Sequence, residues 1–254
     1  MMDQSTWEPL LSEMQRWSDA GRLARFWLRD DDAVEPTPAL DRLIALSDRY
    51  HVPLALAVIP APTGQALAHH LSGKNLVTVT VHGWSHESHA AAGRKKQELG
   101  PERPLATVLG QLEAGLSKLE MLYRGQLSPV LVPPWNRIDQ SICIELEKSG
   151  FAALSVFGPA TTKPGEIPCI NTHVDLMDWH GTRGCRPHGD LVADIVTQMK
   201  QRFDGDDEPI GILAHHLVHD EAAWDFLDAL FGITTQKPGI VWKRLPDEVQ
   251  TITS

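Results

Sequence analysis

The segment RFWLRDDDA, residues 25–33, sets a pattern that the rest of the chain repeats. An apolar run of strand length, residues 24–28, stops at Arg29 and three consecutive aspartates, residues 30–32. Three adjacent carboxylates repel one another and are costly to bury without a counter-charge, which a bound metal ion or a nearby cation supplies. The alternative is a solvated acidic turn. The segment therefore predicts a strand whose carboxyl end carries either a functional acidic cluster or such a turn.

Apolar runs of strand length alternate along the chain with segments of helical apolar spacing, which is typical of βα units around a parallel sheet. The expected strands are 24–28, 54–59, 76–81, 129–132, 151–156, 168–174, 210–214 and 240–242. The expected helices are 7–19, 38–50, 63–71, 105–123, 138–148, 190–203 and 221–230. About seven βα units favour a closed or nearly closed (β/α) barrel, and ligands of such folds bind at the carboxyl ends of the strands.

The composition is that of an ordinary folded protein. No linker or repeat divides the chain, so we expect one α/β domain over residues 1–254 that begins with an N-terminal helix. The net charge of −10 disfavours a nucleic-acid or anionic-membrane partner. No basic leader or membrane-length apolar run is visible, and the three cysteines have no C-x-x-C spacing. We therefore expect a soluble, cytoplasmic protein. The sequence does not indicate an oligomeric state.

Two histidines follow the third expected strand in the segment HGWSH, residues 82–86. Imidazoles four residues apart can point the same way in a helical turn and are a common clamp for a divalent metal ion. The segment is not the zincin motif, because Gly83 stands where that motif needs glutamate. In a chain with 12 histidines, chance is the competing explanation for the spacing.

Three further polar clusters follow other expected strands. They are Pro133, Pro134 and Trp135 after the fourth strand, Asp175, Asp178 and Trp179 after the sixth, and Leu213, His215 and His216 at the seventh. For the proline pair, a rigid turn with a tryptophan over the core is the competing interpretation. Independent surface features would not all fall at carboxyl ends of strands, so the clusters together predict a site there.

The five clusters resemble the motifs of the polysaccharide deacetylase family with the NodB homology domain, also called carbohydrate esterase family 4, over roughly residues 26–216. The resemblance implies a distorted (β/α) barrel with a metal site at the carboxyl ends of the strands. It implies Asp31 as the catalytic base, and Asp32, His82 and His86 as the metal ligands. The expected cofactor is one divalent ion, with zinc first and cobalt, nickel or manganese as alternatives.

The later motifs imply His215 as the general acid, with His216 as the alternative, and Asp178 as the partner of that histidine. The substrate-binding candidates are Trp84, Pro134, Trp135, Trp179 and Leu213. The family's third motif has an arginine that pairs with the catalytic aspartate, and Val132 occupies that position here. Arg29, on the same strand face as Asp31, is the first candidate to replace it, and Arg137 is the second.

The resemblance implies metal-dependent hydrolysis of an acyl group, acetyl first, from the amide nitrogen of an amino sugar or a related substrate. The partner would be a small molecule or an oligosaccharide. A non-catalytic carbohydrate-binding or metal-binding module is the alternative, and the missing arginine is its support. A serine hydrolase is disfavoured because no G-x-S-x-G segment occurs.

Overall fold

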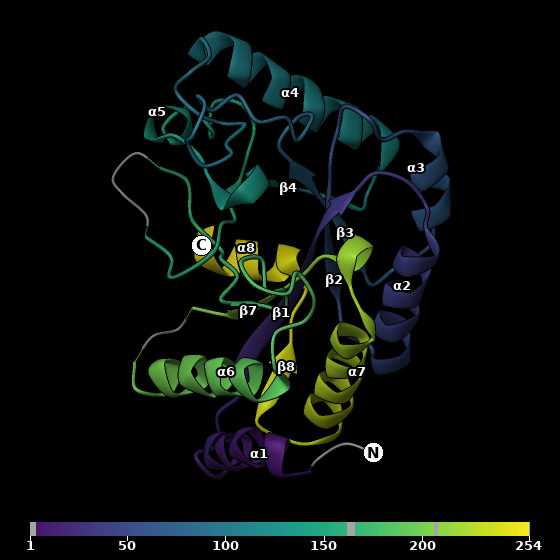
Figure 1. The fold of residues 1–254 in the computed structure, drawn as a ribbon, viewed down its shortest axis with the longest axis vertical. Coiled ribbons are helices and arrows are strands. Elements are labelled where there is room, and N and C mark those ends of the chain that lie inside the picture. The colour runs from purple at the N-terminus through teal and green to yellow at the C-terminus, as the bar shows by residue number, and fades with distance from the viewer. Residues whose placement is uncertain (1–3, 162–165, 206–207, 254) are drawn as a thin grey trace.

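A parallel β-sheet runs through the centre of the protein, and helices pack against its outer face (Figure 1). The computed structural model describes residues 4–161, 166–205 and 208–253. The strand order is β5-β4-β3-β2-β1-β7-β6, and β8 pairs with the first residues of β1. The strand β1 (Ala24–Ala33) is therefore central, with β2 (Leu54–Val58) and β7 (Ile210–Ala214) beside it.

The other strands are β3 (Val77–His82), β4 (Leu127–Val132), β5 (Ala153–Leu154), β6 (Val174–Asp175) and β8 (Ile240–Trp242). The helices are α1 (Gln4–Asp19), α2 (Pro38–Tyr50), α3 (Gln65–Leu71), α4 (Leu105–Leu122), α5 (Gln140–Cys143), α6 (His188–Phe203), α7 (Glu221–Gln236) and α8 (Leu245–Thr253), with 3₁₀ turns η1 (Pro134–Asn136) and η2 (His216–Val218). Within the described residues, none of these helices has the length and apolarity needed to span a membrane.

An irregular segment, residues 168–173, links the two ends of this strand order. On one side, the backbone N–H of Leu154 donates to Pro168 and that of Ile170 donates to Leu154, both at 2.9 Å. On the other side, the N–H of His173 donates to the carbonyl of Gly211 at 2.7 Å. The sheet is thus curled into the distorted barrel that the sequence predicts.

The regular elements differ from the expectation at several places, since β1 continues beyond residue 28 to Ala33 and α7 beyond residue 230 to Gln236. The strand expected at 168–174 is regular only in β6; residues before it make isolated bridges, and the Asn171 side chain adds bonds to the Val156 N–H and the Gly158 carbonyl. The strand expected at 151–156 is reduced to β5. The helix expected at 138–148 is α-helical only in α5 and continues as turns.

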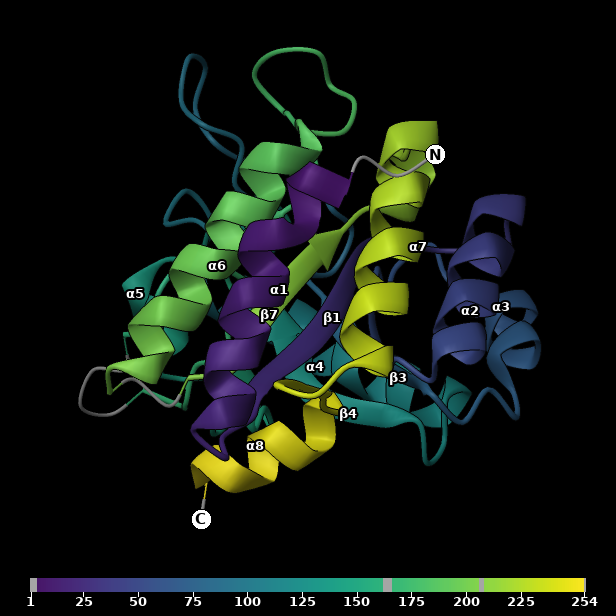
Figure 2. The same ribbon diagram turned by 90° about the horizontal axis from the view of Figure 1, so that it is seen from below.

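The sequence analysis also missed α8, which fills the inside of the barrel at one end (Figure 2). Its apolar residues Leu245 and Val249 pack against Trp27 of β1 and other residues of the inner sheet face. A buried carboxylate on the same helix, Glu248, pairs with Arg25 at 2.7 Å. Helices α1 and α6 lie side by side over the outer face of the sheet. Because α8 occupies one end of the barrel, a site inside it would lie at the other end.

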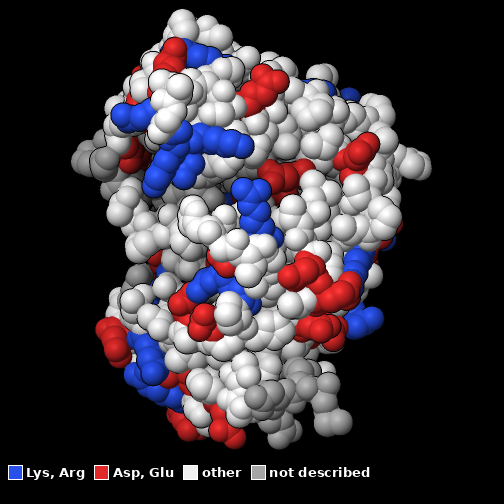
Figure 3. Space-filling model, viewed as in Figure 1, with Lys and Arg blue, Asp and Glu red and all other residues white. Residues whose placement is uncertain are grey.

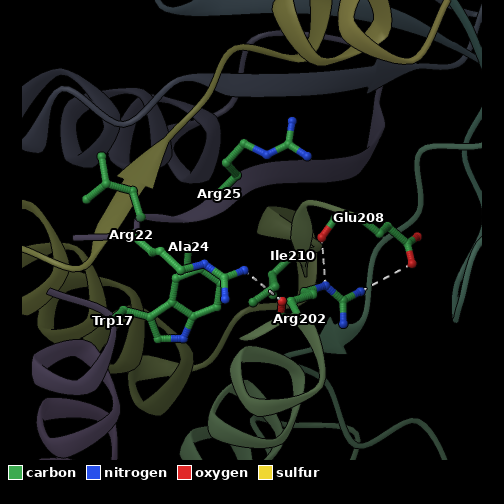
Figure 4. Close-up of a pocket in the computed structure, with 8 residues that line it drawn as sticks. Trp17, Arg22, Ala24, Arg25, Arg202, Glu208 and Ile210 are labelled. Atoms are coloured by element: carbon green, nitrogen blue, oxygen red, sulfur yellow. Dashed lines mark hydrogen bonds and ion pairs between the residues drawn. The ribbon is translucent and has the colours of Figure 1, made fainter. Parts of the chain in front are cut away.

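A cavity of about 230 Å³ lies where β1 and β7 begin, lined by Trp17, Arg22, Arg202 and Glu208 among others (Figure 4). Its guanidinium groups bind protein atoms. Arg22 donates to the carbonyls of Arg202 and Phe203, and Arg202 pairs with Glu208 at 3.2 Å. These contacts fasten α6 to β1, at the end of the strands away from the motifs.

We predict that Gly211→Ala destabilises the barrel where the irregular segment meets β7. A Cβ atom at Gly211 would lie 2.5 Å from the carbonyl oxygen of Asn171 and 2.6 Å from Nε1 of Trp27. Backbone atoms cannot move away cheaply, so we expect the free energy of unfolding to fall by about 1–3 kcal/mol. Urea denaturation followed by tryptophan fluorescence measures the change.

The matched control is Gly110→Ala in α4, where nothing lies within 4 Å of the new Cβ. Alanine is the better helix former, so this variant should gain up to about 1 kcal/mol. Equal stability of the two variants would contradict the tight approach at Gly211.

Candidate metal centre and active site

A β-bulge near the end of β1 positions the two aspartates that the motif analysis singled out. Asp30 pairs with Leu56 of β2, but the next pair is Ala33 with Val58, so β1 has one extra residue in this interval. Asp32 has φ 75°, in the left-handed region. Adjacent residues of a regular strand point to opposite faces. The bulge turns the Asp32 carboxylate toward the end of the barrel, beside that of Asp31.

Three side chains converge there: Asp32 from β1, His82 from the end of β3 and His86 from the loop after β3. Nε2 of His82 lies 3.0 Å from Oδ1 of Asp32, and Nε2 of His86 lies 3.2 Å from the same oxygen. One ligand atom from each residue lies within 4.8 Å of the others, and within the described chain no other group of three His, Cys, Asp or Glu does this. Two imidazole nitrogens and one carboxylate oxygen suit zinc and related divalent ions, and the face away from the protein leaves room for further ligands.

The tautomer of His82 follows from its other ring nitrogen. Nδ1 lies 2.9 Å from the carbonyl oxygen of Val132, which can only accept, so Nδ1 carries the proton and donates it. Nε2 is then the nitrogen left for a metal ion, and it contacts Asp32 at 3.0 Å. A metal-binding histidine typically has this second contact, which fixes the ring and its tautomer.

The electrostatic balance of the three side chains favours a charged carboxylate. Burial alone raises the pKa of Asp32, but the hydrogen bond from His82 and the charges of His82 and His86 outweigh it, so the pKa lies well below its ordinary value. Burial lowers the pKa of His86. Burial acts in the same direction on His82, but its hydrogen bond to Asp32 and the charges of Asp31 and Asp32 outweigh it and raise the pKa of His82. Since a metal ion binds neutral imidazole, it would displace the Nε2 proton of His82.

The loop that carries His86 is built around Glu98, which the sequence analysis did not single out. The fully buried Glu98 carboxylate accepts hydrogen bonds from the backbone N–H groups of Trp84, Ser85 and His86, at 2.8–3.3 Å. Gly83 has φ 58°, and a Cβ there would lie 2.2 Å from Glu98. The glycine that separates HGWSH from the zincin motif therefore lets this carboxylate approach the histidine loop.

Arg29 holds the carboxylate of Asp31. Its Nε lies 2.9 Å from Oδ1 and its second terminal nitrogen 3.0 Å from Oδ2, a two-point contact between buried groups. The remaining donors bind Ser155 at 2.8 Å and the Asn136 side-chain oxygen at 2.7 Å. Both terminal nitrogens of this guanidinium are therefore hydrogen-bonded, and the Asp31 oxygens are held beside the metal-type site, as we call the three converging residues Asp32, His82 and His86.

The second candidate for that contact, Arg137, does not reach Asp31. Its guanidinium donates to the backbone carbonyl of Lys96 at 2.8 Å, in the loop that precedes Glu98. The chain turns sharply just before Arg137, since Trp135 and Asn136 both have φ near 55°. This turn directs Asn136 inward to Arg29 and leaves Arg137 on the rim, so the contact with Asp31 is made by Arg29, the first of the two candidates.

His215 lies across the end of the barrel from the metal-type site, next to Asp175 and Trp179. Nδ1 of His215 is 4.0 Å from Oδ1 of Asp175, and the ring meets the edge of Trp179 at 4.7 Å between centroids. Trp179 donates from Nε1 to Asp175 at 2.8 Å. The backbone N–H of His215 donates to Nε2 of His219, whose pKa burial lowers to about 4, so that it accepts.

The expectation that Asp178 is the partner of His215 is wrong. Asp178 caps the turn after β6, where it accepts from the backbone N–H groups of Gly181 and Thr182 at 2.9 Å. Asp175, the last residue of β6, pairs in register with Leu213 of β7. Since His215 follows Leu213 by two residues, the strand period brings Asp175 and His215 to the same face.

His216 does not serve as the alternative to His215. It is 1% exposed, and its Nδ1 and backbone N–H both contact the buried carboxylate of Asp30. Asp30 and Ala214 are register partners, so side chains at 30 and 216 share the face toward the outer helices. The negative charge of Asp30 outweighs burial and raises the pKa of His216.

The substrate-binding candidates divide into two groups. Trp135 contacts the ring of His86, 4.4 Å between centroids, and Trp179 is 41% exposed beside His215, so both flank the site. Of the other three, Leu213 is fully buried in β7 and Pro134 is the buried first residue of η1, so neither presents a surface. Trp84 is half-buried and packs over Gly115 of α4, and its role in binding stays a prediction.

Comparison with solved structures shows the same fold in carbohydrate-active proteins. A Mycobacterium smegmatis protein assigned to the polysaccharide deacetylases is 13% identical, with a TM-score of 0.64 and 90% of each chain covered. The peptidoglycan deacetylase PdaC of Bacillus subtilis, as its D285S mutant, is 14% identical, with a TM-score of 0.55 over 91% of this chain and 93% of that one. A family 4 acetyl xylan esterase from Clostridium thermocellum, in complex with cobalt, is 14% identical, with a TM-score of 0.53 over 90% and 91%.

No protein-family model and no curated protein sequence matches the chain. The structural likeness spans nine-tenths of the chain at identities that establish the fold alone. The predicted resemblance to the polysaccharide deacetylases is therefore confirmed for the fold, in a sequence that has diverged far from theirs.

We predict that Glu98→Gln weakens metal binding without touching a ligand. The amide presents one acceptor oxygen and an NH₂ group to a cluster of backbone N–H donors, so the loop of His86 loses its fixed position. We expect the affinity for Zn²⁺ to fall by about 10–100-fold, as for other groups that orient ligands. Competition with a chromophoric chelator measures it.

Glu87→Gln is the matched control, because Glu87 is an exposed residue of the same loop. Its Zn²⁺ affinity should remain that of the unaltered protein. Identical affinities for Glu98→Gln and the control would show that the carboxylate does not orient the loop.

Proposed function

We propose that this protein is a metal-dependent hydrolase that removes an acyl group, acetyl first, from the amide nitrogen of an amino sugar. One observation carries the proposal. The three candidate metal ligands, the Asp31 carboxylate that Arg29 holds, and the His215 imidazole beside Asp175 lie at the same end of one barrel. Binding a sugar or an ion alone does not require all three. The fold, shared with deacetylases and an esterase that act on polysaccharides, supports the same chemistry.

The donor set fits one divalent ion, with zinc first and cobalt, nickel or manganese as alternatives. Asp32, His82 and His86 would hold it, and their ligand atoms already converge without rearrangement of the loop. When bound, such an ion polarises the acyl carbonyl and makes water a better nucleophile.

In the proposed reaction, Asp31 accepts the proton of the attacking water. Its two oxygens are held by Arg29, so the carboxylate keeps one orientation. Asp32 cannot share this role while it serves as a ligand. The bulge in β1 thus assigns different tasks to two neighbouring carboxylates.

Cleavage of the C–N bond requires a proton on the departing nitrogen, and His215 is the proposed donor. Imidazole is suited to this step near neutral pH. Nδ1 of His215 lies 4.0 Å from Asp175, and Trp179 restrains both residues by its hydrogen bond to Asp175 and its ring contact with His215. The base and the acid therefore come from different strands and reach the amide from different sides.

An amino sugar suits the walls of the site. Trp135 and Trp179 stand beside the metal-type site and the proposed acid respectively, and flat aromatic faces pack well against the apolar faces of sugar rings. The substrate is an N-acylated amino sugar, free or within an oligosaccharide. The missing arginine at Val132 no longer favours a non-catalytic module, because Arg29 makes the contact that such an arginine would make.

A screen of acetate release from N-acetylated amino sugars, with each of the four metal ions and with chelator, tests the function. We predict that Asp31→Asn lowers kcat by at least about 10²-fold, as loss of a general base does, with the bound zinc per chain retained. His82→Ala should lose both turnover and zinc. Acetate release and elemental analysis on the same preparations measure the two effects.

Asp178→Asn is the control, since its carboxylate caps an exposed turn and faces no reacting group. It should keep turnover, whereas Asp175→Asn should lose most of it. Equal zinc loss in Asp31→Asn and His82→Ala would make Asp31 a ligand and overturn the division of roles.

We also predict that Arg29→Met lowers kcat, because the Asp31 carboxylate would lose the two-point contact that fixes its orientation. Because an unpaired buried charge can cost about 3–5 kcal/mol of stability, the conservative Arg29→Lys is measured beside it and should lose less activity. A kcat in both variants equal to that of the exposed-site control Arg124→Met would show that Arg29 does not act on the base.

A further inference from the structure

Basic side chains gather at one side of the candidate site although the protein is strongly acidic overall. The net charge is −10, yet the loop before Glu98 contains the run Arg94, Lys95 and Lys96, all exposed. Figure 3 shows Lys and Arg side chains grouped on the viewed face, between the places where Figure 1 labels α5 and β4. A local cluster of this sign attracts anions and raises their concentration near the site.

Lys96 of this run and Arg137 lie near the metal-type site, with Trp135 between them and His86. The ring of Trp135 contacts His86 at 4.4 Å between centroids, and the Lys96 ammonium lies 5.8 Å from the centroid of the same ring. Arg137 follows two residues after Trp135 and donates to the Lys96 carbonyl at 2.8 Å. A sugar ring stacked on Trp135 would therefore have both cations within reach of a substituent.

These cations have no carboxylate partner of their own. In the part of the chain that the structure describes, no ion pair involves Lys96 or Arg137. The nearest carboxylates along the chain are committed elsewhere, since Glu98 binds the backbone of the histidine loop and Asp139 caps α5. The Arg137 bond to Lys96 uses one nitrogen, so the rest of the guanidinium is available to a ligand.

We infer that Lys96 and Arg137 form an anion subsite beside Trp135, and that the substrate is an amino sugar carrying a phosphate or carboxylate group. The inference deepens the proposed function and rests on it for the identity of the ligand. The aromatic face binds the ring, the metal-type site faces the acyl group, and the two cations bind the anionic substituent. A compact ammonium and a planar guanidinium together accept either kind of anion.

The test compares three probes that differ in the anionic group. N-acetylglucosamine is neutral, N-acetylglucosamine 6-phosphate carries a phosphate, and N-acetylmuramic acid carries a carboxylate. Calorimetric titration of the purified protein should give at least about tenfold tighter binding of one anionic probe than of the neutral sugar. The preference should shrink as NaCl is raised from about 0.05 to 0.5 M, because rim charges are screened.

Removal of the cations should abolish this preference. We expect the ratio of anionic to neutral affinity to fall about three- to fivefold in Lys96→Met or Arg137→Met, and to approach one in the double variant. Arg124→Met is the matched control. Arg124 is also exposed, but it lies before β4 begins, at the opposite end of that strand from Trp135. This variant should keep the ratio of the unaltered protein.

Equal binding of the three probes, absence of binding by both anionic probes, or a preference that survives in the double variant would each overturn the subsite. Acetate release from the same probes is measured separately. Release without any charge preference would overturn the subsite and leave the proposed function standing. A charge preference lost in the double variant, without release from any probe, would support the subsite and count against the hydrolase.

Discussion

The site depends on one backbone irregularity, the extra residue in β1 between Asp30 and Ala33. Without it, strand alternation would send the carboxylates of Asp31 and Asp32 to opposite faces of the sheet. With it, the Asp32 carboxylate meets His82 at the end of β3 and His86 in the following loop, and the Asp31 carboxylate meets Arg29. The left-handed φ of Asp32 costs conformational energy, of the order of 1–3 kcal/mol for such residues. Parallel pairing of β1 with β2 and β7 on both sides holds the strand in place against that cost.

The second constraint is the placement of charge inside a barrel whose other end is filled. Helix α8 covers the inner sheet face with apolar side chains, and the Arg29 side chain is fully buried, so its guanidinium has no access to water. Its donors are instead matched by Asp31, Ser155 and Asn136, which come from three separate segments. A buried ion pair is weak evidence for stability, but these contacts hold the guanidinium, and with it the Asp31 carboxylate, in one position. The arginine thus positions the proposed base and also ties β1 to the segments after β4 and β5.

The sequence was informative about strand ends and poor about what surrounds them. The apolar runs located β1 to β4 and β7, and the motifs located the convergent triad, because these depend on local spacing. The partner of His215 was wrong, since the choice between Asp175 and Asp178 depends on where β6 stops and in which register it pairs with β7. Glu98 lies 12 residues from His86 in a loop without periodicity, and its role depends on a close approach at Gly83. Helix α8 was missed because it is short, and packing inside the barrel stabilises it.

The absence of arginine at Val132 changes what the end of β4 can do. With the cation for Asp31 supplied by β1, residue 132 contributes only its carbonyl, which fixes the tautomer of His82. The residues that follow Val132 do not have to position a cation beside Asp31, because Arg29 supplies it. Asn136 turns inward to complete the Arg29 network, while Trp135 and Arg137 face the rim, where Arg137 holds the loop of Lys96. Because Arg29 of β1 makes the contact with Asp31, the proposed base is held without a cation at residue 132, and the turn after β4 is left for the anion subsite proposed above.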